Sequence, residues 1–456
     1  MKLAEPEQIG RLLHTQAQLQ AVATDALRYA RTLGATDAII GVSEGNGLSV
    51  SVRRGAVETI EHHRNKRIGV TVFIGHQSGS SSTSDFSRGA VHDAIAAAYH
   101  IARFTATDNA AGPAEAELLE TAPHDLDLYH PWQLSADEAV EIARRAEGAA
   151  FAAGPQIRNS EGASVSAQHS QSVLATSRGF LAGYPHSSHH IACAPIAGSG
   201  RNMQHGNWYS SKRSAADLAA PEAVGRYAAE RALARLGARQ LDTRKVPVLF
   251  EAPLAAGLLG AFVQATSGGA LYRKTSFLVD SLGKAVFAPH VQVIEDPHVP
   301  RAMGSVPFDE EGVRTRARRV VKDGVLEGYF LSTYSGRKLG MQTTGNAGGA
   351  HNLALRSSRT RAGDDFEAML KKLGTGLLLT ELMGQGVNYV TGDYSRGASG
   401  FWVENGVIQY PVEEITVAST LQQMFQGIVA IGADTLVRGT REIGSVLIEQ
   451  MTIAGN

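Results

Sequence analysis

A histidine-rich segment carries residue types that could hold a metal ion. The run His186–His190 (HSSHH) is followed three residues later by Cys193, and imidazole and thiolate groups are good ligands for Zn²⁺. A structural zinc site usually has a second ligand pair nearby and a catalytic one has a carboxylate base, but the surrounding sequence supplies neither. We therefore interpret the run as a polar hairpin tip that leads into a strand.

A glycine-rich segment, Thr343–Asn352 (TTGNAGGAHN), offers many backbone N–H groups with few side chains in the way. Such a segment could bind an anion or an extended peptide. It is not a P-loop, because no Gly-Lys-Ser/Thr ends it, and no strand and helix flank it as in a dinucleotide fingerprint. A tight structural loop is an equal alternative. The residues that could contact a ligand are Asn346, Gly348, Gly349, His351 and Asn352.

A third candidate is Thr391–Gly406 (TGDYSRGASGFWVENG), which combines opposite charges with aromatic surface. Asp393 and Arg396 could pair with each other or hold the terminus of a substrate, and Tyr394 lies between them. The alternative is a glycine-rich turn closed by an Asp–Arg pair and followed by a strand. We favour the structural reading for Trp402 and leave Asp393 and Arg396 open.

The charge balance directs this chain neither to nucleic acid nor to an anionic membrane. Its formal net charge is −1 and its pI is near 7.0, and the basic row Arg314–Arg319 is as well explained by a solvated strand face. Met1–His14 has no apolar leader core, and no run approaches the roughly 20 apolar residues of a membrane helix. A single cysteine precludes an intrachain disulfide. We expect a cytoplasmic location, without membrane or nucleic-acid binding.

The helices and strands expected from the sequence, which must position these residues, indicate an α+β protein with two domains. Residues 1–240 would form a mixed α/β N-terminal domain with an antiparallel sheet, and residues 241–456 a β-rich C-terminal domain with a few helices. The predicted N-terminal helices are Gln16–Leu33, Ser87–Phe104, Ser135–Ala153 and Ala215–Gly237. The predicted strands there are Gly47–Arg53, Val57–His63, Arg67–Ile74 and Ser78–Ser84, followed by a hairpin of Ser164–Gly179 and Phe180–His190.

The second half begins with an expected strand, Val246–Glu251, and an apolar helix, Ala252–Ala270, in which no residue can ionise. Pro253 suits the first turn of that helix. The turn dipeptides Asp323-Gly324 and Asn405-Gly406 predict hairpins. Further strands are predicted at Val291–Glu295, Thr315–Lys322, Val325–Thr333, Gly386–Thr391, Gly400–Glu404 and Val407–Val417, with helices at Asp365–Leu373 and Leu421–Ile431.

Together these segments resemble the TldD/PmbA proteins, a family also known as modulators of DNA gyrase. The similarity spans essentially the whole chain, with weaker motifs in the N-terminal half. It is carried by Tyr272–Gly283 (YRKTSFLVDSLG), Phe308–Arg314 (FDEEGVR), Ser335–Gly349 (SGRKLGMQTTGNAGG), Leu373–Trp402 and the final Met451–Asn456 (MTIAGN). Several long motifs in the same order make chance agreement a poor explanation.

The resemblance implies which branch of the family this chain represents. The TldD branch carries a helix with His-Glu, three residues and a second His, and a Cys near the C-terminus as a further zinc ligand. Alignment places Gly260 at the first His, Ala261 at the Glu and Ala265 at the second His, and Val437–Asn456 contains no Cys. Glycine and alanine can neither ligate Zn²⁺ nor accept a proton from metal-bound water. The chain is thus similar to the PmbA, or TldE, branch, which lacks the zinc site.

The resemblance implies a subunit of a cytoplasmic TldD/TldE-type metalloprotease that degrades or processes unfolded peptides. No residue of this chain would be catalytic and no cofactor would bind it; a TldD-like partner would hold the zinc. Gly345–Asn352 and Asp393–Arg396 would face the substrate channel, and the chain could form a homodimer when alone.

Two other functions stay open. One is an autonomous metallopeptidase with an atypical metal site, which would depend on His186, His189 or His351. The other is a non-enzymatic modulator of DNA gyrase, for which the row Arg314–Arg319 is the only sequence support.

Overall fold

The computed structural model describes residues 12–455, which divide into two compact units. Unit 1 contains the described residues up to Leu233 together with His298–Thr315 and Ser332–Lys338. Unit 2 contains Ala234–Pro297, Arg316–Leu331 and the residues from Leu339 onward. Two short segments of the second half of the chain therefore fold with the first half. Most of Met1–His14, and the last residue of the MTIAGN motif, lie outside the described residues.

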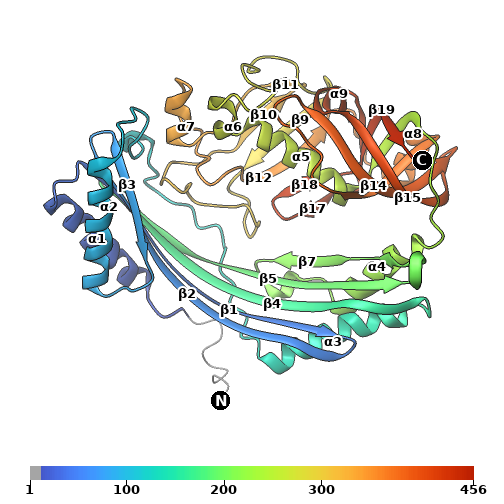
Figure 1. The fold of residues 1–456 in the computed structure, drawn as a ribbon, viewed down its shortest axis with the longest axis horizontal. Coiled ribbons are helices and arrows are strands. Elements are labelled where there is room, and N and C mark those ends of the chain that lie inside the picture. The colour runs from blue at the N-terminus through green and yellow to red at the C-terminus, as the bar shows by residue number, and fades with distance from the viewer. Residues whose placement is uncertain (1–11, 456) are drawn as a thin grey trace. The chain divides into compact units, whose positions relative to one another are not determined.

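Unit 1 is built on a seven-stranded antiparallel sheet with the order β3-β2-β1-β4-β5-β6, in which β7 also pairs with β5. Figure 1 shows β1, β2, β4 and β5 running side by side as long, curved strands. The strands are β1 Asp37–Arg53, β2 Ala56–Ile74, β3 Gln77–Thr83, β4 Ile157–Thr176, β5 Leu181–Ala197, β6 Gln204–His205 and β7 Trp208–Lys212.

The predicted antiparallel meander is confirmed, but with three strands instead of four. The predicted strands Val57–His63 and Arg67–Ile74 are both part of β2, which pairs with β1 from Ala56 to Phe73. The residues between them are polar and exposed, so side-chain alternation gives no sign that the strand continues. The Arg54-Gly55 turn is confirmed, and both residues adopt the positive φ that such a tight hairpin requires.

Helices pack their alanine-rich faces onto this sheet. They are α1 Gln16–Thr32, α2 Arg88–Phe104, α3 Ala136–Ala152 and α4 Pro221–Ala234, with 3₁₀ turns at Ala116–Leu118, Gly200–Asn202 and Ala215–Asp217. The capping box of Ser135 and Glu138 is confirmed. Ser87 instead turns its hydroxyl to Asp85, and the predicted helix Ala215–Gly237 begins only at Pro221, whose ring suits a first turn but not a helix interior.

Replacing either of two glycines on these helices with alanine should change stability, in opposite directions. A Cβ on Gly225 of α4 would lie 1.8 Å from the carbonyl oxygen of Ala146 on α3, so Gly225→Ala must force the helices apart and should destabilise unit 1 by about 1–3 kcal/mol. A Cβ on Gly148 of α3 would meet no atom within 4 Å. Gly148→Ala should therefore stabilise the protein by about 1 kcal/mol. Urea unfolding of both variants checks this, and a stable Gly225→Ala would contradict the close approach.

Unit 2 contains two six-stranded sheets. One has the order β11-β10-β9-β12-β18-β17, and the other has the order β15-β14-β13-β8-β19-β16 and closes through β15 and β19 into a barrel. The first consists of β9 Val291–Asp296, β10 Arg318–Lys322, β11 Val325–Leu326, β12 Asn352–Ser357, β17 Leu436–Arg438 and β18 Arg441–Ile443. The second consists of β8 Arg244–Phe250, β13 Gly376–Met383, β14 Asp393–Glu404, β15 Val407–Thr420, β16 Ile428–Ile431 and β19 Val446–Ala454.

The predicted helix Ala252–Ala270 is two helices. The first, α5, spans Ala252–Thr266; Ser267 then adopts extended backbone angles, and its hydroxyl caps α6, Gly268–Tyr272, by accepting from the N–H of Ala270. The remaining helices are α7 Thr333–Lys338 of unit 1, α8 Phe366–Leu373 and α9 Leu421–Gln426.

Other boundaries of the second half also differ from the prediction. Helix α9 stops at Gln426, because Ile428–Ile431 pairs with β19 as β16. Gly386–Thr391 is a loop instead of a strand, with Gly386 pressed against the carbonyl oxygen of Ser395 at a distance only glycine tolerates. Strands β10 and β11 are shorter than Thr315–Lys322 and Val325–Thr333.

The two predicted turn dipeptides are confirmed, since Asp323, Gly324, Asn405 and Gly406 all have positive φ. The mixture of helices with largely antiparallel sheets confirms the α+β class. Within residues 12–455 there is no helix with both the length and the apolar character needed to cross a membrane.

Candidate functional site

Helix α5 is a core element of unit 2. It starts with Pro253 in its first turn. Its buried side chains join the main hydrophobic cluster of this unit. Phe262 is fully buried and packs edge-on against Phe287, with ring centroids 5.2 Å apart. Any functional group placed on α5 must therefore compete with packing.

The guanidinium group of Arg441 covers Gly260. Arg441 lies at the start of β18, and its Nη1 donates to the carbonyl oxygen of Ala256 at 3.1 Å. A Cβ on Gly260 would lie only 2.8 Å from the same Nη1. Burial lowers the pKa of the Arg441 guanidinium. A cation thus fills the space beside Gly260, which the resemblance aligned with the first zinc-binding His.

Ala261 and Ala265, aligned with the Glu and the second His, have different surroundings. Ala265 has no exposed surface, and its carbonyl oxygen accepts a hydrogen bond from the hydroxyl of Ser276 at 2.5 Å. Ala261 lines a cavity of about 100 Å³. Among residues 12–455, no three side chains of His, Cys, Asp or Glu are grouped so that they could hold a metal ion. The residues at this position therefore do not fit a zinc ion, and zinc content stays a prediction.

Polar groups enter this cavity from β14. Tyr394 is 4% exposed, and burial raises the pKa of its hydroxyl to about 12. Arg396 follows two residues later on the same strand face, lines the same cavity and lies beside the Tyr394 side chain. The Nε atom of Arg396 is buried and has no hydrogen-bond partner among the described residues. This places an unsatisfied cationic donor beside α5.

Of the two alternatives left open for Asp393 and Arg396, the mutual ion pair does not form. Both lie on β14, and residues three apart on a strand point to opposite faces. The Asp393 carboxylate instead accepts from the Thr391 hydroxyl at 2.6 Å. The Trp402 indole donates to Glu404 at 2.9 Å, as expected of an ordinary strand aromatic. Of the residues predicted in this segment, the cavity contains Tyr394 and Arg396 but not Asp393.

The glycine-rich segment is held by a buried carboxylate. Glu295 on β9 is 1% exposed and accepts from Arg318 Nε at 2.7 Å, Asn346 Nδ2 at 2.7 Å and the backbone N–H of His351 at 2.9 Å. The imidazole Nε2 of His351 lies 2.8 Å from the carbonyl oxygen of Gly345. Asn352 Nδ2 donates to the carbonyl oxygen of Asp296 at 2.8 Å. These polar side chains are thus engaged within unit 2, which favours the structural alternative for them.

Gly348 and Gly349 have positive φ, and a Cβ on Gly349 would meet no atom within 4 Å. The backbone beside Gly349 is therefore the part of this segment with open space around it, and a role in peptide contact stays a prediction for it.

The histidine-rich run lies in the middle of β5 and not at a hairpin tip. The β4–β5 ladder continues past it to Ala175 and Leu181. Burial lowers the pKa of His186 to about 4 and raises the pKa of the Cys193 thiol to about 12. His189 is fully buried, and its Nε2 lies 2.8 Å from the carbonyl oxygen of His130. Burial therefore disfavours the charged forms of these three groups on β5 of unit 1.

The predicted row of arginines does not form. Arg314 belongs to unit 1 and donates to the carbonyl oxygen of Leu119 at 3.2 Å. The strand begins only at Arg318, which pairs with Glu295, while Arg316 and Arg319 are exposed. A single basic strand face is therefore absent from this part of the described chain.

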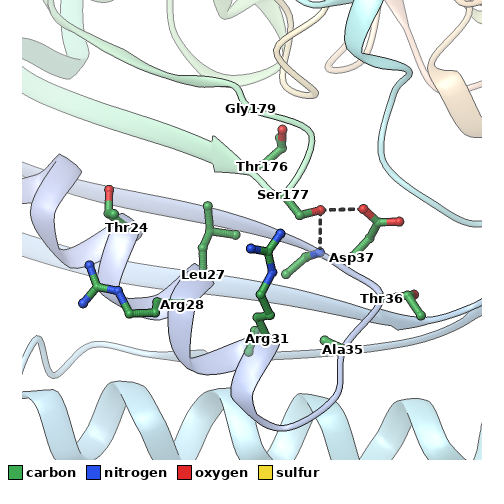
Figure 2. A pocket seen from close by; sticks show the side chains of 12 residues that line it. Thr24, Leu27, Arg28, Arg31, Ala35, Thr36, Asp37, Thr176, Ser177 and Gly179 are labelled. Carbon is green, nitrogen blue, oxygen red and sulfur yellow. Dashed lines mark hydrogen bonds between the residues drawn. The ribbon is translucent and has the colours of Figure 1, made fainter.

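A second hollow, of about 310 Å³, lies in unit 1 between α1 and the start of β1. Figure 2 shows the Ser177 hydroxyl pointing toward the carboxylate of Asp37. It donates to Asp37 at 2.6 Å and accepts from the Ala38 N–H at 3.1 Å. Arg178 forms an ion pair with Asp37 at 2.8 Å. These polar groups satisfy one another's hydrogen-bonding needs, which indicates a structural role for them.

Comparison with known proteins finds similarity over nearly the whole chain. Residues 38–102, 129–236 and 243–455 match the family models described as PmbA/TldA metallopeptidase domain 1, central domain and C-terminal domain. Metalloprotease PmbA of Escherichia coli O157:H7 is 46% identical over 416 residues, which cover 91% of this chain and 92% of that protein.

Two solved structures share the fold. A "putative modulator of DNA gyrase" from Bacteroides thetaiotaomicron has a TM-score of 0.91 at 24% identity, covering 98% of this chain and all of that one. TldE from Thermococcus kodakarensis has a TM-score of 0.83 at 17% identity, covering 95% of this chain and all of that one. At these identities the likeness concerns the fold alone.

Proposed function

Because the chain belongs to the PmbA/TldD metallopeptidase family, we propose that it is the PmbA/TldE-type subunit of a two-subunit metalloprotease. A TldD-like partner would hold the zinc ion, and the assembly would degrade or process unfolded peptides in the cytoplasm. This subunit would contribute peptide-binding surface, and in the absence of its partner it would pair with itself.

One observation carries the proposal: a guanidinium group lies where a metal-binding side chain would be needed. Arg441 covers Gly260 and is hydrogen-bonded to α5. Arginine has no lone pair to offer and stays protonated, so it repels a nearby Zn²⁺ ion. Without a carboxylate at Ala261, no general base remains on the helix. The chemistry would therefore have to come from another chain.

A sheet edge without a described partner strand supports the part of the proposal that concerns an unfolded peptide. Within residues 12–455, positions 56–67 of β2 pair with β1 on one side, while β3 covers only the stretch from Ile68 to Ile74 on the other. All of residues 56–67 are exposed. An extended peptide or a strand of a partner can add to such an edge through backbone hydrogen bonds.

The proposal predicts how activity depends on the two chains. The purified chain alone should hold less than stoichiometric zinc and should not cleave an unfolded peptide. Mixed with a TldD-like subunit, it should give an assembly whose peptide cleavage stops when a chelator removes the metal. Metal analysis and cleavage assays of each chain alone and of both together test this. Stoichiometric zinc together with chelator-sensitive cleavage by this chain alone would overturn it.

A further inference from the structure

The cavity beside α5 has an apolar wall and a cationic end. Its lining side chains are apolar on α5 and at Phe250, Leu382 and Val387, and polar at Gln385, Tyr389, Tyr394 and Arg396. Its volume of about 100 Å³ is several times what one water molecule needs. None of the described residues that line it is acidic. The site is therefore shaped for a small group that carries negative charge.

The strongest indication of a ligand is the buried Nε of Arg396. A buried donor without an acceptor costs as much as a lost hydrogen bond, so most such groups in folded proteins have partners. The Tyr394 side chain contacts the same guanidinium. The planar guanidinium fork matches a carboxylate, which can accept two parallel N–H donors.

A second cation lies against the same helix. The Arg441 guanidinium covers Gly260 of α5, the neighbour of Ala261, which lines the cavity. The acidic group on the adjoining strand, Glu381, is engaged by Arg235. With two arginines nearby and no lining carboxylate, an anion is favoured and an amine is repelled.

We propose that this cavity binds the C-terminal carboxylate of a peptide, with Arg396 donating to the carboxylate and Leu254 and Leu258 contacting the last side chain. The inference rests on the proposed function, because it assigns to the zinc-free subunit the task of holding the peptide end. A C-terminal residue combines a carboxylate with an aliphatic side chain on neighbouring atoms, as this cavity requires. Inorganic phosphate would leave the apolar wall without a partner.

Binding of a short peptide to the chain alone tests the inference directly. Titration calorimetry at low salt should show binding of the tripeptide Ala-Leu-Val as the free acid. Its C-terminal amide, and an amidated Ala-Asp-Val with only a side-chain carboxylate, should bind at least about tenfold more weakly, since each loses a charged hydrogen bond. Equal affinity for acid and amide, binding of the Asp peptide as tight as the free acid, displacement by inorganic phosphate, or no binding at all would overturn the proposal.

Variants separate the site from general charge effects. Arg396→Gln should weaken free-acid binding by about tenfold or more, and Arg396→Lys should restore part of it because the charge remains without the fork. Arg319→Gln removes an exposed cation of the same unit and should bind as the parent does. Unchanged affinity of Arg396→Gln would contradict the assignment.

A variant on the opposite wall guards against misfolding as an explanation. Ala261→Val adds bulk from α5 into the cavity without changing any charge, and it should also abolish the acid-over-amide preference while thermal unfolding stays cooperative.

The carboxylate site and the proposed function can be tested independently of each other. If the reconstituted assembly cleaves peptides but the chain alone shows no acid preference, the carboxylate site is wrong and the proposed function stands. If the chain alone is a zinc peptidase, the proposed function is wrong.

Discussion

Replacing Glu295 with alanine is expected to destabilise unit 2 by about 3–5 kcal/mol, because it leaves a charged partner uncompensated in the interior. The Glu295 carboxylate accepts from the guanidinium of Arg318, the side-chain amide of Asn346 and the backbone N–H of His351. Without it, Arg318 keeps only neutral acceptors, namely the carbonyl oxygen of Tyr329 and the side-chain oxygen of Asn346. The segment before β12 loses two of its anchors at once.

Urea unfolding of Glu295→Ala against Glu327→Ala measures this effect. Glu327 is an exposed carboxylate of the same unit, so its removal changes the net charge equally and should alter stability by less than about 0.5 kcal/mol. A second readout is local: the amides around Gly348 should exchange with solvent faster in Glu295→Ala than in the parent. If both variants unfold at the same urea concentration, the carboxylate does not anchor the segment.

Local signals in the sequence predicted much of this fold. The capping box at Ser135 and Glu138 and the turn at Arg54-Gly55 act through neighbouring residues, and both are confirmed. Features that depend on distant partners were missed. Ser267 divides α5 from α6 by capping the second helix, yet the apolar pattern continues through it. Likewise, β16 takes its strand conformation from pairing with β19, although its residues follow a helical pattern.

At the candidate site, too, the sequence predicted local features and missed contacts with distant residues. Alignment of the helix motif identified Gly260, Ala261 and Ala265, because these positions follow one another on a single helix. It could not reveal Arg441, which contacts the helix at Ala256 from 185 residues away in the chain. Strand alternation would have placed Tyr394 with Arg396 on one face, but opposite charge suggested Asp393 instead. The structure follows the alternation of side chains along the strand. Asp393 hydrogen-bonds Thr391 and forms no salt bridge with Arg396.

Ala265→His places a histidine at the position aligned with the second zinc-binding His of the TldD branch. We expect it to destabilise the chain by about 2–6 kcal/mol instead of creating a metal site. Ala265 has no exposed surface and belongs to the main hydrophobic cluster of unit 2. An imidazole there overpacks the core, which costs about 1–3 kcal/mol, and buries a polar group, which costs a similar amount. Thermal and urea unfolding of the variant measure the loss.

The neighbouring substitution Gln264→His is the matched control, since it adds the same group on the exposed side of the same helix and should change stability by less than about 0.5 kcal/mol. Zinc provides the functional readout, because a metal that binds only the folded state must raise its unfolding temperature. With Arg441 over Gly260 and alanine at 261, added zinc should leave the unfolding temperature of Ala265→His unchanged. A zinc-dependent rise would mean that α5 still holds the geometry of a metal site and has lost only its ligands, whereas its absence would mean that packing has taken over the helix.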